Sequence, residues 1–170
     1  MSKEMATYYS QHTPEFVDRL GKIRAGNATS LVATVFPNLS FITNNIIHIW
    51  HPRGPQKTEV WSYCYLDKDT PADVRAAMRI NQMETFGPSG NFEQDDMNNF
   101  MQCTKAGNSR IGVKVPLNFQ MGLGRERVDE EIPGAVGSPM SDSNQRAFYA
   151  RWAEMMDAPG WSQISVGSRT

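Results

Sequence analysis

A short acidic segment at residues 92–96, with the sequence FEQDD, is the part of the chain best suited to chemistry. If this segment is helical, Asp96 lies on the same face as Phe92, whereas Asp95 points about 100° away from that face. An ionised carboxylate on an apolar face needs a cation, strong hydrogen-bond donors or a proton, because burying it alone costs several kcal/mol. Asp96 is therefore a candidate metal ligand, while Glu93 and Asp95 fit the ordinary preference of carboxylates for the first turn of a helix.

Aromatic residues bracket this carboxylate in the sequence. Phe86, Phe92 and Phe100 lie on either side of Asp96, and Phe36 ends a strand that we expect to be buried. A carboxylate surrounded by phenylalanine and by the small residues of the intervening GPSG turn suits an apolar substrate held beside a metal. Ordinary core packing is the alternative interpretation of these aromatic side chains.

The histidines and cysteines do not complete a metal site with Asp96. His48 and His51 are three residues apart on an expected strand, so their side chains leave opposite faces and cannot both bind one ion. We expect each to be an ordinary, hydrogen-bonded histidine. Cys64 and Cys103 have no histidine at Cys-x-His or Cys-x-x-His spacing, so this chain alone cannot assemble an iron–sulfur cluster. We expect both to be reduced, buried thiols of a cytoplasmic protein.

The helices and strands that the sequence predicts around these residues indicate an α+β fold, with an antiparallel sheet packed against helices. Strands are expected at residues 30–36, 39–43, 45–51, 58–66 and 111–115. Helices are expected at residues 14–26, 71–83, 91–103 and 141–157, and a long loop at 121–140. Both faces of the strand at 58–66 are at least half apolar, which predicts that this strand is covered on both sides.

The composition limits the class of protein. The 170 residues are enough for one domain with a core, and a net charge of −1 gives no electrostatic case for nucleic acid or an anionic membrane. No apolar run is long enough to span a bilayer, and the first residues, MSKEMA, lack the apolar core of a secretory signal. We therefore expect a single domain over residues 1–170 in the cytoplasm.

Four segments, in matching order and spacing, resemble the C-terminal part of the catalytic domain of the large (α) subunit of Rieske-type aromatic-ring-hydroxylating dioxygenases. The resemblance covers about residues 36–156. Its segments are VFPNLSF at 35–41, IWHPRGP at 49–55, TFGPSGNFEQDD at 85–96 and NQRAFYARWAEM at 144–155.

The resemblance implies a helix-grip (Bet v 1/START-like) catalytic domain that holds mononuclear non-haem Fe(II) with two histidines and one aspartate. It implies that Asp96 is the aspartate ligand and that Phe86, Phe92 and, with a weaker match, Phe36 line the substrate pocket. The expected reaction adds O2 to an aromatic substrate and gives a cis-dihydrodiol. The expected partners are a Rieske [2Fe–2S] domain, a ferredoxin or reductase as electron donor, and a small β subunit.

The departures from the family pattern are as informative as the matches. The chain has no Asp-x-x-His segment, in which the family carries its histidine ligands, and no Rieske cysteine and histidine pairs. One iron ligand of three is present, so we expect the C-terminal portion of a larger subunit, inactive without the missing N-terminal half and prone to oligomerise. The alternatives are a non-enzymatic helix-grip module that binds an apolar ligand, a purely structural subunit, or the product of a decayed gene.

Overall fold

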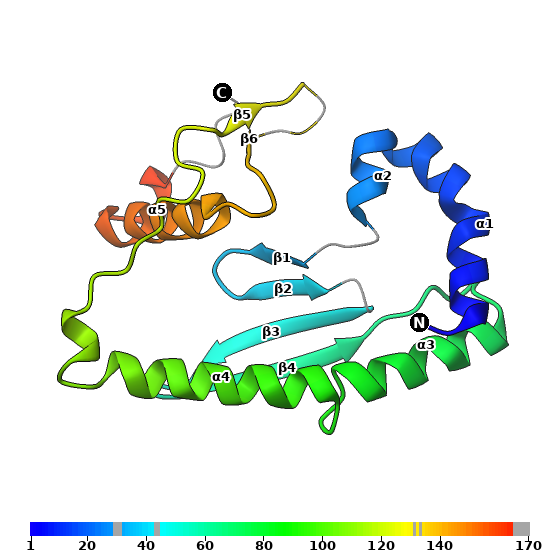
Figure 1. Cartoon of the computed structure of the whole chain (residues 1–170), viewed down its shortest axis with the longest axis horizontal. Helices are drawn as coiled ribbons and strands as arrows, with labels where there is room; N and C mark the ends of the chain where they lie inside the picture. Colours follow the sequence, from blue (N-terminus) through cyan, green and yellow to red (C-terminus); the bar gives the residue numbers. More distant parts are fainter. Residues whose placement is uncertain (29–31, 43–44, 131, 133, 165–170) are drawn as a thin grey trace. The chain divides into compact units, whose positions relative to one another are not determined.

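The computed structural model describes residues 1–28, 32–42, 45–130, 132 and 134–164 (Figure 1). The chain divides into two compact units, Met1–Val115 and Pro116–Thr170. The first unit holds a four-stranded antiparallel sheet and its helices, and the second holds a two-stranded ribbon and a long helix. The predicted α+β class with an antiparallel sheet is thus confirmed. None of the described helices is long and apolar enough to cross a membrane.

The sheet of the first unit has the strand order β1-β2-β3-β4, with all neighbours antiparallel. The strands are β1 (Val32–Val35), β2 (Leu39–Ile42), β3 (Ile46–Pro52) and β4 (Thr58–Cys64). The isoleucine-rich sequence of β3 suits a pleated strand, and its alternation buries Ile46 and His48 on the face opposite Ile47. The predicted β3–β4 hairpin is confirmed, and its turn contains Gly54 with a positive φ of 119°.

The helices of the first unit include one that begins earlier than predicted. They are α1 (Lys3–Leu20), α2 (Lys22–Ala28), α3 (Ala72–Thr85) and α4 (Asn91–Gly107). The predicted start at residue 14 is wrong because Ser2 caps α1, accepting a hydrogen bond of 3.4 Å from the backbone N–H of Met5. Met5 is buried against Val74 and Met78 of α3, and these three side chains form the core between α1 and α3.

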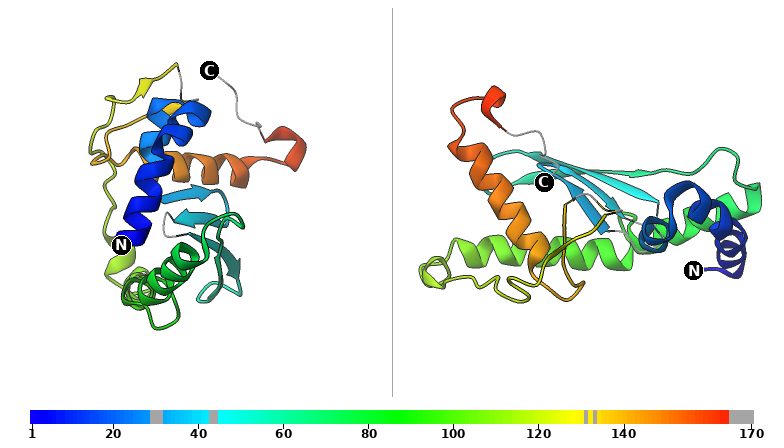
Figure 2. Two further views of the ribbon diagram at one scale, coloured as in Figure 1. Left: turned by 90° about the vertical axis from the view of Figure 1, so that its right-hand side faces the viewer. Right: turned by 90° about the horizontal axis from the view of Figure 1, so that it is seen from above.

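A tight break separates α3 from α4, and α4 runs alongside β3 and β4 whereas α3 continues toward α1 (Figures 1 and 2). The break is closed by a hydrogen bond of 2.8 Å from the N–H of Gly90 to the carbonyl of Gly87. Gly90 packs against the backbone of Thr85 and Phe86, so a Cβ atom there would overlap main-chain atoms. The predicted helix break at this segment is confirmed, and it fixes where α4 begins.

Both faces of β4 are largely exposed, contrary to the prediction that this strand is covered on both sides, and only Val60 is partly buried. Trp61, Tyr63 and Tyr65 are all exposed, and we call these three side chains the aromatic strip. Each of the three keeps 44–47% of its surface accessible among the residues that the structure describes. Cys64 and Cys103 are free, as predicted, but both are exposed, so the prediction of buried thiols is wrong.

Two irregular segments also differ in detail from the prediction. The expected strand at 111–115 is a short 3₁₀ turn, η1 (Gly112–Lys114). In the second unit, the expected loop at 121–140 contains a two-stranded ribbon, and the helix predicted at 141–157 is confirmed. The elements of this unit are β5 (Arg127–Val128), β6 (Ala135–Val136), α5 (Ser143–Asp157) and η2 (Trp161–Gln163).

Candidate functional site

Asp96 lies on α4, in the turn that follows the α3–α4 break. Its side chain is partly buried whereas that of Asp95 is exposed, so the predicted difference between the two neighbours is confirmed. The expectation of a buried face is not met, because Phe92 and Phe100 are exposed and no residue of α4 is fully buried. The carboxylate of Asp96 therefore sits at the edge of the packed interior of the first unit.

The structure brings together two of the three predicted pocket aromatics. The rings of Phe86 and Phe92 have their centroids 5.5 Å apart, across the break between α3 and α4. The ring of Phe86 also lies 6.5 Å from that of His48 on β3, edge to face. Phe36 is partly buried in the turn between β1 and β2, on a separate element. Phe86 and Phe92 thus form an aromatic wall beside the start of α4.

A buried histidine–carboxylate pair lies next to this wall, and sequence reasoning missed it. His48 Nε2 is 3.6 Å from Glu93 Oε2, and the two side chains are only 3% and 13% exposed. Neither atom has a hydrogen-bond partner within the described part of the chain. The prediction that both histidines are hydrogen-bonded is not met at Nε2, since neither His48 Nε2 nor His51 Nε2 has a partner among the described residues. The available signal was the position of His48 on β3, where it shares the buried face with Ile46.

The electrostatics of the pair also involve Asp96. Burial lowers the pKa of His48, and the nearby charge of Asp96 partly opposes this shift. Burial raises the pKa of Glu93, and Asp96 raises it further by like-charge repulsion. Both shifts favour the uncharged forms of the two side chains. Because the charge of Asp96 acts on both partners, the three side chains share one neighbourhood.

The described residues do not provide a complete metal site. A carboxylate such as that of Asp96 is one of the donors that non-haem iron uses, together with imidazole nitrogens. Among the residues that the structure describes, however, no three His, Cys, Asp or Glu side chains are arranged to hold a metal ion. The described part of this chain therefore supplies one suitable donor and does not by itself fit an Fe(II) centre.

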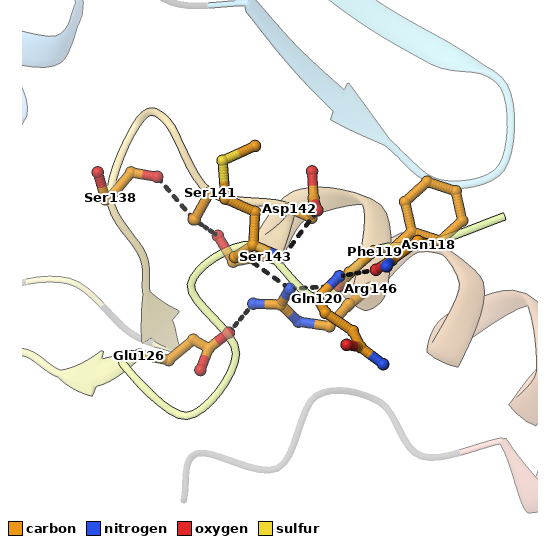
Figure 3. Close-up of polar contacts among 10 residues, drawn as sticks. Asn118, Phe119, Gln120, Glu126, Ser138, Ser141, Asp142, Ser143 and Arg146 are labelled. Carbon is orange, nitrogen blue, oxygen red and sulfur yellow. Dashed lines mark hydrogen bonds and ion pairs between the residues drawn. The ribbon is translucent and has the colours of Figure 1, made fainter.

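The second unit is organised by Arg146 of α5 (Figure 3). Its guanidinium donates hydrogen bonds to the carbonyls of Phe119 at 2.6 Å and Met121 at 3.1 Å, and forms an ion pair with Glu126. The hydrogen bond from Arg146 lowers the pKa of Glu126. Asp142 closes the same loop by accepting a bond of 3.0 Å from the N–H of Met121. One planar donor group thus holds the incoming loop at several points.

Replacing Arg146 with methionine is expected to loosen the loop at residues 118–126. Methionine keeps the aliphatic length of the side chain but removes every donor to the two carbonyls and to Glu126. Thermolysin should then cleave this loop about 10-fold faster, because the open form becomes more populated. Arg19→Met is the matched control, since the Arg19–Glu15 pair is an exposed i,i+4 pair on α1. An unchanged cleavage rate in Arg146→Met would contradict the role given to this arginine.

Comparisons with known proteins place the chain in a family. The family profile described as "Ring hydroxylating alpha subunit (catalytic domain)" matches residues 2–158. The chain is 39% identical over 133 residues to the biphenyl dioxygenase subunit alpha of Paraburkholderia xenovorans, covering 77% of the chain and 29% of that protein. It is 31% identical to the chlorobenzene dioxygenase subunit alpha of a Cupriavidus species, covering 98% of the chain and 38% of that protein.

The fold agrees with this assignment. A solved structure of naphthalene 1,2-dioxygenase with indole bound in the active site matches with a TM-score of 0.81 and 27% identity. That match covers 96% of the chain and 38% of the dioxygenase chain. The chain therefore spans well under half the length of the relatives that it matches. Since the family profile spans most of these residues, the chain belongs to the family of ring-hydroxylating dioxygenase alpha subunits and represents a part of their catalytic domain.

Proposed function

We propose that this chain is part of an aromatic-ring-hydroxylating dioxygenase that adds O2 to an arene to give a cis-dihydrodiol. The observation that carries the proposal is the position of Asp96, a partly buried carboxylate on α4 four residues after Phe92, whose ring packs against that of Phe86. The relatives named biphenyl, chlorobenzene and benzene dioxygenases support an arene as the class of substrate.

In this proposal Asp96 is the carboxylate ligand of a mononuclear non-haem Fe(II), and Phe86, Phe92 and Phe36 line the substrate pocket. Bound iron would supply the oxygen chemistry. The phenylalanines would hold a flat apolar ring by dispersion and edge-to-face contacts and would keep water away from it. Exposure of Phe92 in the chain alone is consistent with a pocket whose other walls come from elsewhere.

The remaining parts of the site would come from polypeptide outside these 170 residues. The missing N-terminal half would bring the two histidine ligands and complete a helix-grip domain, of which residues 1–170 are one part. A Rieske [2Fe–2S] domain in the missing N-terminal part, reduced by a ferredoxin or reductase, would deliver electrons to the iron. A small β subunit and oligomerisation would complete a cytoplasmic enzyme, and neither nucleic acid nor a membrane is a partner.

The chain alone is expected to be catalytically inactive. Purified chain supplied with Fe(II), O2, a ferredoxin–reductase pair and biphenyl or naphthalene should form no dihydrodiol above background, because one carboxylate does not retain iron. Co-expression with a polypeptide that carries the rest of an α subunit, together with a β subunit, should yield product detectable by chromatography. Dihydrodiol formed by the chain alone would overturn the requirement for further ligands.

A second candidate function is a non-enzymatic module that binds an apolar ligand. The incomplete donor set among the described residues favours it, because the aromatic wall of Phe86 and Phe92 persists without a metal site. A pure binder gains nothing from the carboxylate of Asp96, so Asp96→Leu should leave its arene affinity unchanged and its stability equal or higher. Iron-independent arene binding that survives this substitution would favour the module over the enzyme.

A further inference from the structure

Apolar packing does not explain why the polar side chains of His48 and Glu93 are buried together. Nearly all buried polar atoms in proteins have a hydrogen-bond partner, yet His48 Nε2 and Glu93 Oε2 have none among the described residues. The two atoms face each other at 3.6 Å, just beyond the usual N–O range of about 2.7–3.2 Å. A small rotation of either side chain brings them into a hydrogen bond, so each is the natural partner of the other.

One end of this pair is firmly held. His48 occupies the middle of β3, where it is paired with Ser40 of β2 on one side and Ser62 of β4 on the other. Its neighbour on the same face, Ile46, is completely buried. A residue with strands on both sides cannot shift along the sheet without breaking both ladders. His48 is therefore a fixed reference point within the first unit.

The other end of the pair is attached to the segment that carries the proposed ligand. Glu93 is the third residue of α4, and Asp96 follows three residues later. Residues three apart lie next to each other on the surface of a helix, about 5–6 Å between their Cβ atoms. Anything that fixes the rotation of Glu93 about the helix axis therefore also fixes the direction in which Asp96 leaves the helix.

The apolar contacts nearby do not fix this rotation. The rings of Trp50 on β3 and Phe100 on α4 meet edge to face at 5.9 Å, and Phe86 approaches His48 at 6.5 Å. Such contacts keep the helix on the sheet, but aromatic pairs form over a range of centroid distances of about 4.5–7 Å, so they tolerate a small turn of the helix. A buried polar pair has a defined geometry, and specifying register is the best-supported role of such pairs.

We infer that His48 and Glu93 are a positioning pair, which ties the first turn of α4 to the centre of β3 and thereby fixes the direction of the Asp96 carboxylate. The inference deepens the proposed function, on which the role of Asp96 as an iron ligand rests. Neither His48 nor Glu93 is a metal ligand or a catalytic residue. Their role is to orient the carboxylate of Asp96.

The test is the side-chain rotamer of Asp96 in the full chain, measured by NMR from three-bond couplings that report its χ1 angle. In the unsubstituted chain the couplings should correspond to one rotamer. Glu93→Asp shortens the side chain by one methylene and keeps its carboxyl group, and Glu93→Leu removes the polar end. In both variants we expect Asp96 to average over several rotamers, and the amides at 95–97 to exchange about 10-fold faster.

Two further variants separate positioning from general loosening. Glu93→Gln keeps the length and a group that can hydrogen-bond to His48, so it should restore the single rotamer. Gln94→Leu is the matched control, because Gln94 is the next residue along α4 and is exposed. It should leave the couplings unchanged. His48→Leu should reproduce the effect of Glu93→Leu, and the double variant should add nothing further.

The inference is overturned if Asp96 keeps one rotamer in Glu93→Asp and Glu93→Leu, or if it already averages in the unsubstituted chain. It is also overturned if Gln94→Leu loosens Asp96 to the same extent, because the effect is then not specific to the pair. No metal takes part in these measurements. Failure of the proposed function, seen as iron retention without the Asp96 carboxylate, is therefore a separate result from failure of the positioning pair.

Discussion

Replacing Asp96 with asparagine is expected to remove iron from an oxygenase assembled from this chain and the remaining α-subunit polypeptide. Asparagine has the same size but offers a neutral amide oxygen, a weaker donor to a divalent cation than the carboxylate. Loss of supporting residues around a metal typically costs 10–100-fold in affinity, so loss of a ligand should cost at least about 100-fold. Iron content after desalting, measured by mass spectrometry, and dihydrodiol yield should both fall to background.

Asp95 provides the matched control for this experiment. It is the adjacent carboxylate on the same helix, and its side chain is exposed whereas that of Asp96 is partly buried. Asp95→Asn removes the same charge from the same region, so any general effect of net charge appears in both variants. Iron content and product yield should stay unchanged in Asp95→Asn. Equal iron content in both variants would exclude Asp96 as a ligand and favour the binding-module alternative.

Among glycine-to-alanine substitutions at the α3–α4 break, Gly90→Ala is expected to lower the stability of the chain most. The added Cβ would lie 2.8 Å from the backbone nitrogen of Phe86 and would overlap the carbonyl group of Thr85. These are main-chain atoms at a tight break, so they cannot rotate away as a flexible side chain can. Overpacking of this kind costs about 3 kcal/mol, which should lower Tm by about 6–12 °C in a chain of this size.

The other end of the same helix supplies the control for this substitution. Gly107 is the last residue of α4, and a Cβ there meets no atom within 4 Å. Gly107→Ala should therefore stabilise the chain by about 0.5 kcal/mol, because alanine loses less backbone entropy in a helix. Thermal unfolding followed by circular dichroism gives both shifts. Similar Tm values for the two variants would show that the α3–α4 break adapts to a side chain at Gly90.

Local sequence patterns predicted the framework of the site well. Strong turn residues and alternating apolar residues located the β3–β4 hairpin, and the GPSG segment marked the break before α4. The helical period also separated Asp96 from Asp95, since one residue of rotation changes which side chain meets the sheet. Each of these features depends on residues that are close together in the chain, so a single sequence contains the information.

Features that depend on distant parts of the chain could not be predicted in this way. His48 and Glu93 are 45 residues apart, and nothing in the spacing of either one indicates the other. The exposure of the aromatic strip, on β4 and the residue after it, was also not predicted. The sequence of an apolar strand is the same whether the residues that pack over it belong to this chain or to another. Coverage is a property of the whole assembly, and this chain spans only part of its relatives.

The aromatic strip of Trp61, Tyr63 and Tyr65 also bears on how the protein must be produced in a cell. Exposed aromatic side chains on an edge strand are what chaperones and proteases recognise in unfinished proteins, and they favour pairing between copies. We expect this chain to be recovered in soluble form at lower yield when it is produced alone than when it is produced together with a polypeptide that covers the strip.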